Sequence, residues 1–164
     1  MATPDFILKL REKIGHDPLW LIGVTAYVED GRGRVLLGRR RDTGEWALVY
    51  GIVDPGEEPA AAAAREVREE AGVDCVPRAL VGVKAGDPLT YANGDRCQFL
   101  DVMFSCELDP SGNADPFVGD DESLSVGWFA PDEFPEPLAA STRDRLARLA
   151  RFRENGASAA GFDL

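Results

Sequence analysis

The segment from Pro59 to Gly72 constrains the fold more than any other part of the chain, because its residue types specify one helix with two distinct faces. Pro59 suits a first helical position, the alanines at 60–64 are the strongest helix formers, and Gly72 is a typical helix stop. At about 100° per residue, the small side chains fall within one narrow arc, at Ala60, Ala63, Ala64, Val67 and Ala71. We therefore expect this helix to lie close against a sheet or a loop.

Three glutamates, Glu66, Glu69 and Glu70, occupy the arc beside this face of small residues. Glu66 and Glu70 are one helical turn apart, a like-charge spacing that destabilises an isolated helix by about a few tenths of a kcal/mol. Arg65 lies one turn before Glu69 and offsets part of that repulsion. Two interpretations follow. The glutamates form either a solvated acidic face or a site in a cleft for a hard divalent cation, Mg²⁺ or Mn²⁺.

The loop that precedes the helix favours the cation site. The segment 51–57, Gly-Ile-Val-Asp-Pro-Gly-Glu, brings a fourth carboxylate, Glu57, to the N-terminus of the helix, where the helix dipole stabilises negative charge. Gly51 and Gly56 allow the backbone to approach a ligand closely or to adopt a positive φ. A tight loop that delivers a carboxylate onto a glutamate-rich helix is typical of a metal site.

The same residues carry a resemblance to a known family. Gly51 is followed after five residues by Glu57, and after seven more by the run 65–73, Arg-Glu-Val-Arg-Glu-Glu-Ala-Gly-Val. This pattern is similar at every fixed position to the Nudix box, G-x5-E-x7-R-E-U-x-E-E-x-G-U, where U is aliphatic. Weaker likeness extends to Arg41-Asp42-x-Gly44-x-Trp46, to Trp128-Phe129 and to 132–135. The resemblance implies an α/β fold, the α/β/α sandwich of that family with a mixed β-sheet.

The resemblance also implies an activity, the hydrolysis by metal-activated water of a nucleoside diphosphate linked to another group, X. Glu66 and Glu70 are then the principal metal ligands, and Glu69 is a third or water-mediated ligand. Glu57 supports the metal shell, and Arg65 orients the carboxylates by ion pairing. Tyr50 departs from the pattern, because many members of the family have glycine there. We expect the backbone carbonyls of Tyr50 and Gly51 to stay near the metal and the adjacent pocket to have a different shape.

The remaining candidates lie outside the box. Glu122, six residues before Trp128, is a candidate general base or a solvated loop acid. Strand alternation places Arg39 and Arg41 on one face, where one of them contacts phosphate or both are solvated, and turns Arg40 away. Trp46 either stacks on a base or packs in the core. Tyr91 and Phe99 are further pocket candidates.

The chain has 164 residues and carries 18 Lys+Arg against 29 Asp+Glu, a net charge of −11. This charge argues against nucleic-acid polymers and anionic membranes as partners. Three cysteines without metal-type spacing fit a reducing compartment, and neither a secretory signal nor a membrane-length apolar run is expected, so the sequence predicts a cytoplasmic protein. His16, the single histidine, reads as a surface residue.

A single domain is predicted over residues 1–154, with a flexible tail at 155–164. The expected helices are 4–14, 59–71 and 138–152, and the expected strands are 19–29, 34–41, 79–84, 98–108 and 125–130, with a short apolar segment at 46–50. Helices and strands are interspersed, which indicates a mixed α+β class. By analogy with the family, we expect a homodimer in which the N-terminal helix and strand either exchange or pack between the two copies.

The substrate stays open at this level. In the family, a proline about sixteen residues past the box suggests ADP-ribose and a tyrosine suggests dinucleoside polyphosphates; here Pro88 and Tyr91 both lie near that distance. A MutT-like pyrophosphatase acting on nucleoside triphosphates is equally compatible. The alternatives to turnover of a small nucleotide are a nucleotide-sensing binding module with the same fold and a metal-dependent isomerase.

Overall fold

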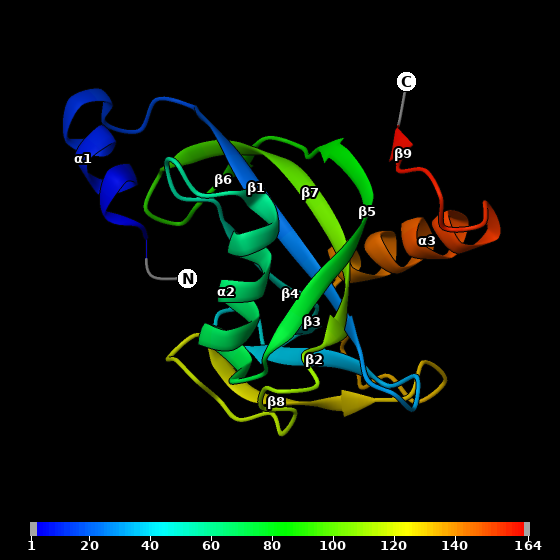
Figure 1. The fold of residues 1–164 in the computed structure, drawn as a ribbon. Coiled ribbons are helices and arrows are strands. Elements are labelled where there is room, and N and C mark those ends of the chain that lie inside the picture. The colour runs from blue at the N-terminus through cyan, green and yellow to red at the C-terminus, as the bar shows by residue number, and fades with distance from the viewer. Residues whose placement is uncertain (1–2, 163–164) are drawn as a thin grey trace.

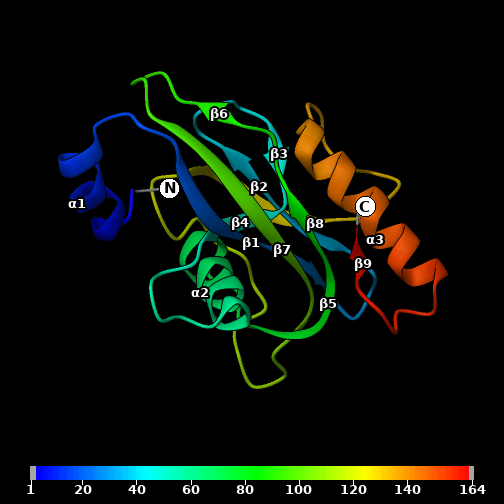
Figure 2. The same ribbon diagram turned by 90° about the horizontal axis from the view of Figure 1, so that it is seen from above.

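The computed structural model describes residues 3–162 as a mixed sheet between two helices (Figure 1). Helix α2 (Pro59–Ala71) covers one face of the sheet and helix α3 (Ala140–Glu154) covers the other, as the view from above shows (Figure 2). Helix α1 (Asp5–Ile14) lies at one end, beside the start of the first strand. The α/β/α sandwich with a mixed sheet is therefore confirmed.

Nine strands form one sheet within the described residues. They are β1 (Leu19–Glu29), β2 (Val35–Arg40), β3 (Trp46–Ala47), β4 (Val49–Ile52), β5 (Cys75–Ala85), β6 (Leu89–Thr90), β7 (Arg96–Leu108), β8 (Ser123–Phe129) and β9 (Gly161–Phe162). Their main order is β3-β2-β1-β7-β5-β9, with β4 on β1, β6 on β7 and β8 on β2. Strand β1 runs parallel to β7 along its whole length and antiparallel to β4.

The pairing of β1 with β4 determines where the glycine loop begins. Tyr50 lies opposite Thr25 and Gly51 opposite Val24, so both residues are held inside the sheet, although the sequence predicts a loop from Gly51. The chain leaves β4 at Ile52 and enters α2 seven residues later. A short, anchored connection of this kind fixes Gly51 relative to the helix.

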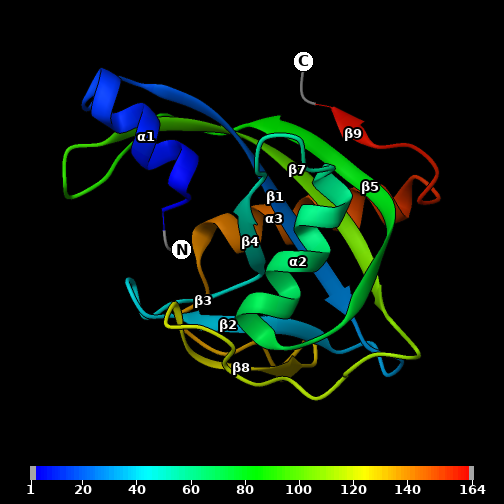
Figure 3. The ribbon, with the colours of Figure 1, turned by 60° about the vertical axis from the view of Figure 1, so that its left-hand side comes forward.

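Two apolar clusters fill the sandwich, one on each face of the sheet. Under α2, Ala63, Val67 and Ala71 pack on Val24 and other β1 side chains, as the small-residue face predicts. Ala62 is buried there as well. Under α3, the cluster consists mainly of Tyr27, Val35, Leu37, Leu48, Val81, Met103, Leu149 and Phe152. Figure 3 shows α2 in front of the sheet and α3 behind it.

The end of the chain differs from the predicted flexible tail. Gly161 and Phe162 form β9, which pairs in parallel with Gly82 and Val83 of β5. The outer edge of β5 presents unpaired backbone groups, and this pairing satisfies some of them. Strand β5 is also longer than predicted, because all of Cys75–Ala85 runs beside β7. Residues 1–2, at the start of the predicted domain, and residues 163–164, at the end of the predicted tail, lie outside the described residues.

Two further findings bear on the sequence predictions. Cys75, Cys97 and Cys106 are all free and buried. Within residues 3–162, no helix is long and apolar enough to cross a membrane.

Candidate active site

Arg65 gathers three of the box carboxylates around one guanidinium group. Its Nε and Nη2 donate to the two oxygens of Glu57, both at 2.8 Å, and Nη1 donates to Glu66 and Glu69, both at 3.0 Å. Nη2 also donates to the carbonyl of Ile52 at 3.1 Å, which ties the helix to the end of β4. The hydrogen bonds from Arg65 hold the pKa of Glu57 below its usual range. Arg65 therefore neutralises and orients the outer carboxylates.

Glu66 lies directly against the backbone of Gly51. Its side chain is buried, with 7% of the residue exposed. A Cβ atom at position 51 would overlap the carboxyl group of Glu66. The glycine is thus required by close approach between strand and helix, and its φ is not in the positive range.

Glu70 is the carboxylate with the least compensation. It is 7% exposed, and its buried Oε1 has no hydrogen-bond partner among residues 3–162. Burial, followed by the nearby charges of Glu66 and Asp120, raises the pKa of Glu70 to about 8. Burial also raises the pKa of Glu66, although Arg65 opposes it. Glu66 and Glu70 are thus two buried carboxylates whose ionisation is unfavourable without a nearby cation. A divalent cation would stabilise their charged forms and would coordinate the Oε1 atom of Glu70.

The four glutamates do not all converge on one point. Among residues 3–162, no three acidic, His or Cys side chains stand together in an arrangement that could hold a metal ion. Glu57 uses both oxygens on Arg65, and Glu69, whose side chain is 55% exposed, is paired with the same guanidinium. The structure therefore sets Glu66 and Glu70 apart as the inner pair. The metal-facing role of the Tyr50 and Gly51 carbonyls stays a prediction.

The loop before β8 covers the C-terminal end of α2. The backbone N–H groups of Phe117 and Gly119 donate to the carbonyls of Ala71 and Glu70 at 3.0 and 3.1 Å. A Cβ at position 119 would overlap the carbonyl of Glu69, so the loop and the helix are in intimate contact. This docking brings Asp120 near Glu70, a neighbour that sequence reasoning missed; the only local signal is the glycine before it.

Glu122 lies farther along the same loop, beside a surface hollow of about 1020 Å³ that is lined by residues 40–42 and 118–122. Its backbone carbonyl accepts a hydrogen bond from the N–H of Arg41 at 2.8 Å, and its N–H donates to Asp120 at 2.9 Å. Glu122 thus borders the same region as Asp120, and its role as a base stays a prediction.

The arginines at the end of β2 are arranged differently from the sequence expectation. The β2–β8 register shifts between Arg39 and Arg40, and this bulge breaks the alternation on which the prediction depends. Arg39 lies outside both hollows and donates to the carbonyl of Gly44 at 3.1 Å. Arg41 lines the smaller hollow and donates to the carbonyl of Asp121 at 2.6 Å. Arg40, which was expected to point away, lines both hollows.

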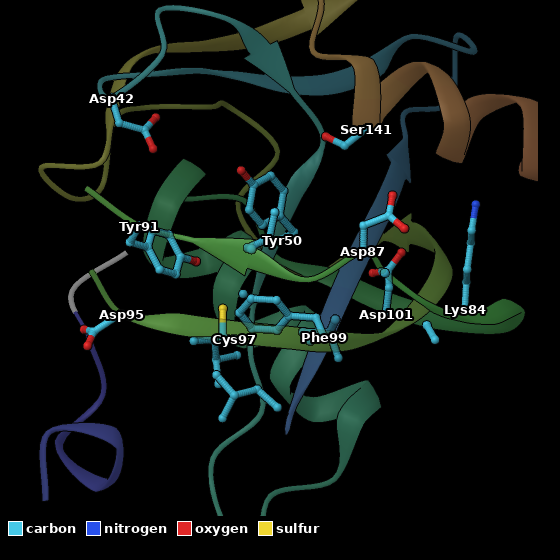
Figure 4. Close-up of a pocket in the computed structure, with 18 of the residues that line it drawn as sticks. Asp42, Tyr50, Lys84, Asp87, Tyr91, Asp95, Cys97, Phe99, Asp101 and Ser141 are labelled. Carbon is cyan, nitrogen blue, oxygen red and sulfur yellow. The ribbon is translucent and has the colours of Figure 1, made fainter. Parts of the chain in front are cut away.

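The larger hollow, of about 1120 Å³, opens on the sheet face that carries Gly51. Tyr50, Tyr91 and Phe99 project their rings toward one part of it (Figure 4), and Ile7 of α1 contributes to its wall. Trp46 is not part of the lining. It packs edge-on against Phe129, with ring centroids 4.9 Å apart, in the cluster under α3, so the packing alternative holds for this residue.

The far part of the larger hollow is charged. Asp101, 9% exposed, accepts a hydrogen bond from the Thr25 hydroxyl at 2.7 Å and pairs with Arg145 at 3.1 Å and Arg148 at 3.4 Å. Lys84 lies near Asp101 on this side of the hollow (Figure 4). The hollow therefore combines an aromatic part and an ion-paired part, and Gly51, against which Glu66 lies, is one of its lining residues.

The mixed sheet lies between two helices, and the buried carboxylates of α2 lie beside Gly51 of β4. This is the arrangement expected of a Nudix hydrolase. The chain belongs to this family, because the NUDIX domain profile matches residues 20–149. It is therefore an enzyme of a family whose members generally use divalent metals and act on small nucleotide substrates.

Named relatives agree with this assignment. The chain is 35% identical over 129 residues to a MutT-like protein of Streptomyces ambofaciens, covering 79% of this chain and 76% of that protein. It is 35% identical over 112 residues to human 8-oxo-dGDP phosphatase NUDT18, which covers 68% of this chain but only 32% of that protein. The MutT Nudix hydrolase structure from Burkholderia pseudomallei superposes with a TM-score of 0.62 at 29% identity, over 80% of this chain and 98% of that one.

Proposed function

We propose that this chain is a metal-dependent pyrophosphohydrolase that cleaves the diphosphate linkage of a nucleoside diphosphate linked to X. The observation that carries the proposal is Glu70, whose buried Oε1 lacks a hydrogen-bond partner in the described part of the chain and which is close enough to a second buried carboxylate, Glu66, for their charges to interact. Glu66 lies against Gly51, which lines the larger hollow, and Glu70 is influenced by the charge of Arg40, which lines both hollows. Buried negative charge behind the lining of a cavity suits an enzyme that must hold cations against a phosphate chain.

Glu66 and Glu70 would hold the metal, and Mg²⁺ or Mn²⁺ fits their oxygen donors. When bound, such an ion neutralises phosphate oxygens and lowers the pKa of a coordinated water. Arg65 pairs with Glu57 and Glu69 and so neutralises part of their charge. These two carboxylates therefore repel the incoming phosphate less. The aromatic part of the larger hollow suits a base, and its ion-paired part suits a polar group X.

The named relatives indicate which substrates to test first. NUDT18 is an 8-oxo-dGDP phosphatase and another relative is MutT-like, so oxidised guanine nucleotides are candidates together with ADP-ribose and nucleoside triphosphates. The experiment is a panel of 8-oxo-dGDP, 8-oxo-dGTP, dGTP and ADP-ribose with release of phosphate, pyrophosphate or nucleotide as readout. We expect turnover of at least one compound with Mg²⁺ and none in excess EDTA. Binding without turnover of any compound would favour the nucleotide-sensing module.

We propose Glu122 as the general base, supported by its position on the loop that docks on α2. Glu122→Gln should lower kcat by about 10²-fold or more, since general base catalysis typically contributes that much, and should leave KM within a few-fold. Asp120→Asn is the matched variant on the same loop, with a smaller expected loss. If Asp120→Asn is the more damaging change, the role passes to Asp120. If neither matters, the base lies elsewhere.

The compartment and the assembly belong to the same proposal. Three free, buried cysteines support a reducing compartment, the cytoplasm. A homodimer stays a prediction by analogy, and light scattering of the purified chain would measure it.

A further inference from the structure

Tyr50 is the residue of the box region that departs from the family pattern, and it has two cationic neighbours. The Arg40 guanidinium carbon lies over its ring, 4.9 Å from the centroid, and that of Arg145 lies 5.0 Å from it. Contacts of this length fall in the range of cation–π attraction. Glycine at this position would provide neither a ring nor a wall. Tyr50 instead projects into the larger hollow (Figure 4).

The two arginines are anchored to different extents. Arg145 pairs with Asp101, which is itself buried and bonded to Thr25, so this cation is part of a rigid network. Within residues 3–162, Arg40 forms its ion pair with Asp42, through two hydrogen bonds of 2.9 and 2.7 Å. Because the side chain of Asp42 is 59% exposed, that anchor is a solvated one. The ring of Tyr50 is a second contact of the Arg40 guanidinium beside Asp42, and it restricts the position of that group further.

Arg40 occupies the junction of the two hollows. It lines both, together with Asp42, and it is close enough to Glu70 for their charges to influence each other. A cation at this point is close to the inner carboxylate Glu70 and borders both hollows, where the phosphate chain of the proposed substrate would enter. An unanchored arginine side chain loses rotamer freedom on binding an anion, so holding it in advance favours binding.

We propose that Tyr50 is a positioning residue, whose ring holds the Arg40 guanidinium at the junction of the two hollows so that Arg40 binds the diphosphate of the substrate. The identity of that anion rests on the proposed function. The proposal explains why tyrosine stands where many family members have glycine: the Tyr50 ring fills the space beside Gly51 and fixes the position of the Arg40 guanidinium. It also assigns the phosphate contact to Arg40 rather than to Arg39 or Arg41.

The test is a double-mutant cycle measured by calorimetric titration of inorganic pyrophosphate in Mg²⁺, which needs no base recognition and no turnover. Arg40→Met should weaken binding by about tenfold, and Tyr50→Leu, which keeps bulk but removes the ring, by a similar factor. The double variant should also be about tenfold weaker, because the second change removes a contact that is already lost. Tyr50→Phe keeps the ring and should stay within twofold.

Controls separate positioning from structural support. Arg32→Met removes the same charge from the exposed turn between β1 and β2 and should leave pyrophosphate affinity unchanged. The thermal midpoint of each variant, measured without ligand, shows whether a binding loss reflects unfolding. A hundredfold loss in the double variant, an effect of Tyr50→Leu below twofold, or equal losses in the Phe and Leu variants would overturn the proposal.

The outcomes also separate this proposal from the proposed function. Absence of pyrophosphate binding to the wild-type chain would overturn the role of Arg40 and Tyr50 even if a nucleotide is hydrolysed. Coupled binding effects without turnover of any panel compound would leave the role of Tyr50 intact and remove the hydrolase proposal.

Discussion

Glu70→Gln should lower nucleotide hydrolysis by about 10³-fold or more while the protein stays folded. Glutamine keeps the shape of the side chain but removes the negative charge, and a metal ion contributes several kcal/mol to catalysis of this kind. The buried Oε1 of Glu70, for which the described residues supply no hydrogen-bond partner, is the atom that the change should affect most. Turnover of the substrate identified by the panel, measured at saturating Mg²⁺, is the readout.

Stability should move in the opposite direction in the metal-free protein. The pKa of Glu70 is raised from 4.5 to about 8, so ionising this group costs free energy in the folded state. Metal-free wild type should therefore lose stability as pH rises from about 4.5 through about 8, and the loss in Glu70→Gln should be smaller. Denaturant unfolding in EDTA at several pH values measures both curves.

Glu58→Gln is the matched control, because Glu58 is an exposed glutamate at the start of the same helix. It should leave hydrolysis unchanged. The combined variant Glu66→Gln Glu70→Gln removes both inner carboxylates, and activity within a few-fold of wild type in that variant would refute the catalytic site argued above.

The helix that carries these glutamates could be predicted because its determinants are local. Alanine propensity, Pro59 and Gly72 define its bounds, and the observed helix runs from Pro59 to Ala71 with Gly72 in the left-handed conformation. The burial of Glu66 and Glu70 follows from the narrow face beside them. Helical periodicity determines which side chains share a face, and contacts made elsewhere in the chain do not alter it.

The rest of the site depends on contacts between distant segments, which no local pattern encodes. Arg40 enters the hollows because a bulge on β2 shifts the register against β8, some 80 residues later in the chain. Asp120 reaches Glu70 because its loop docks on the end of α2. The sequence leaves two alternatives for Trp46, because an aromatic residue near a glycine turn can stack on a nucleotide base or pack in the core. The contact with Phe129 favours packing in the core.

The net charge of −11 gains a more specific meaning from this arrangement. An acidic protein should repel a phosphate substrate, yet the described site pairs its outer acids and one oxygen of Glu66 with Arg65, so that Glu70 and the rest of the Glu66 carboxylate are left for cations. Helix α1, which lies before the matched span of 20–149, also contributes to the larger hollow. The larger hollow therefore includes residues that the family pattern does not cover.

Gly51→Ala should lower hydrolysis by about 10²-fold or more, although alanine is the smallest possible addition. The new methyl group would overlap the carboxyl group of Glu66, so the inner carboxylate would have to leave its position beside β4. Misplacing a reacting group by about 1 Å typically costs about 10²-fold in rate. The φ of Gly51 is outside the positive range, so the backbone itself accepts alanine and the effect should fall on the site rather than on the strand.

Two other glycines separate steric displacement from backbone strain. Gly31→Ala adds its methyl group to open space and should change neither stability nor turnover. Gly56→Ala also meets open space, but its φ of +87° makes alanine unfavourable, so we expect a loss of about 1–2 kcal/mol in unfolding free energy with little change in kcat. Only Gly51→Ala should lose activity while keeping its unfolding midpoint near that of wild type. If all three variants keep wild-type kcat, Glu66 does not need its place against the strand, and the assignment of Glu66 to the inner pair is wrong.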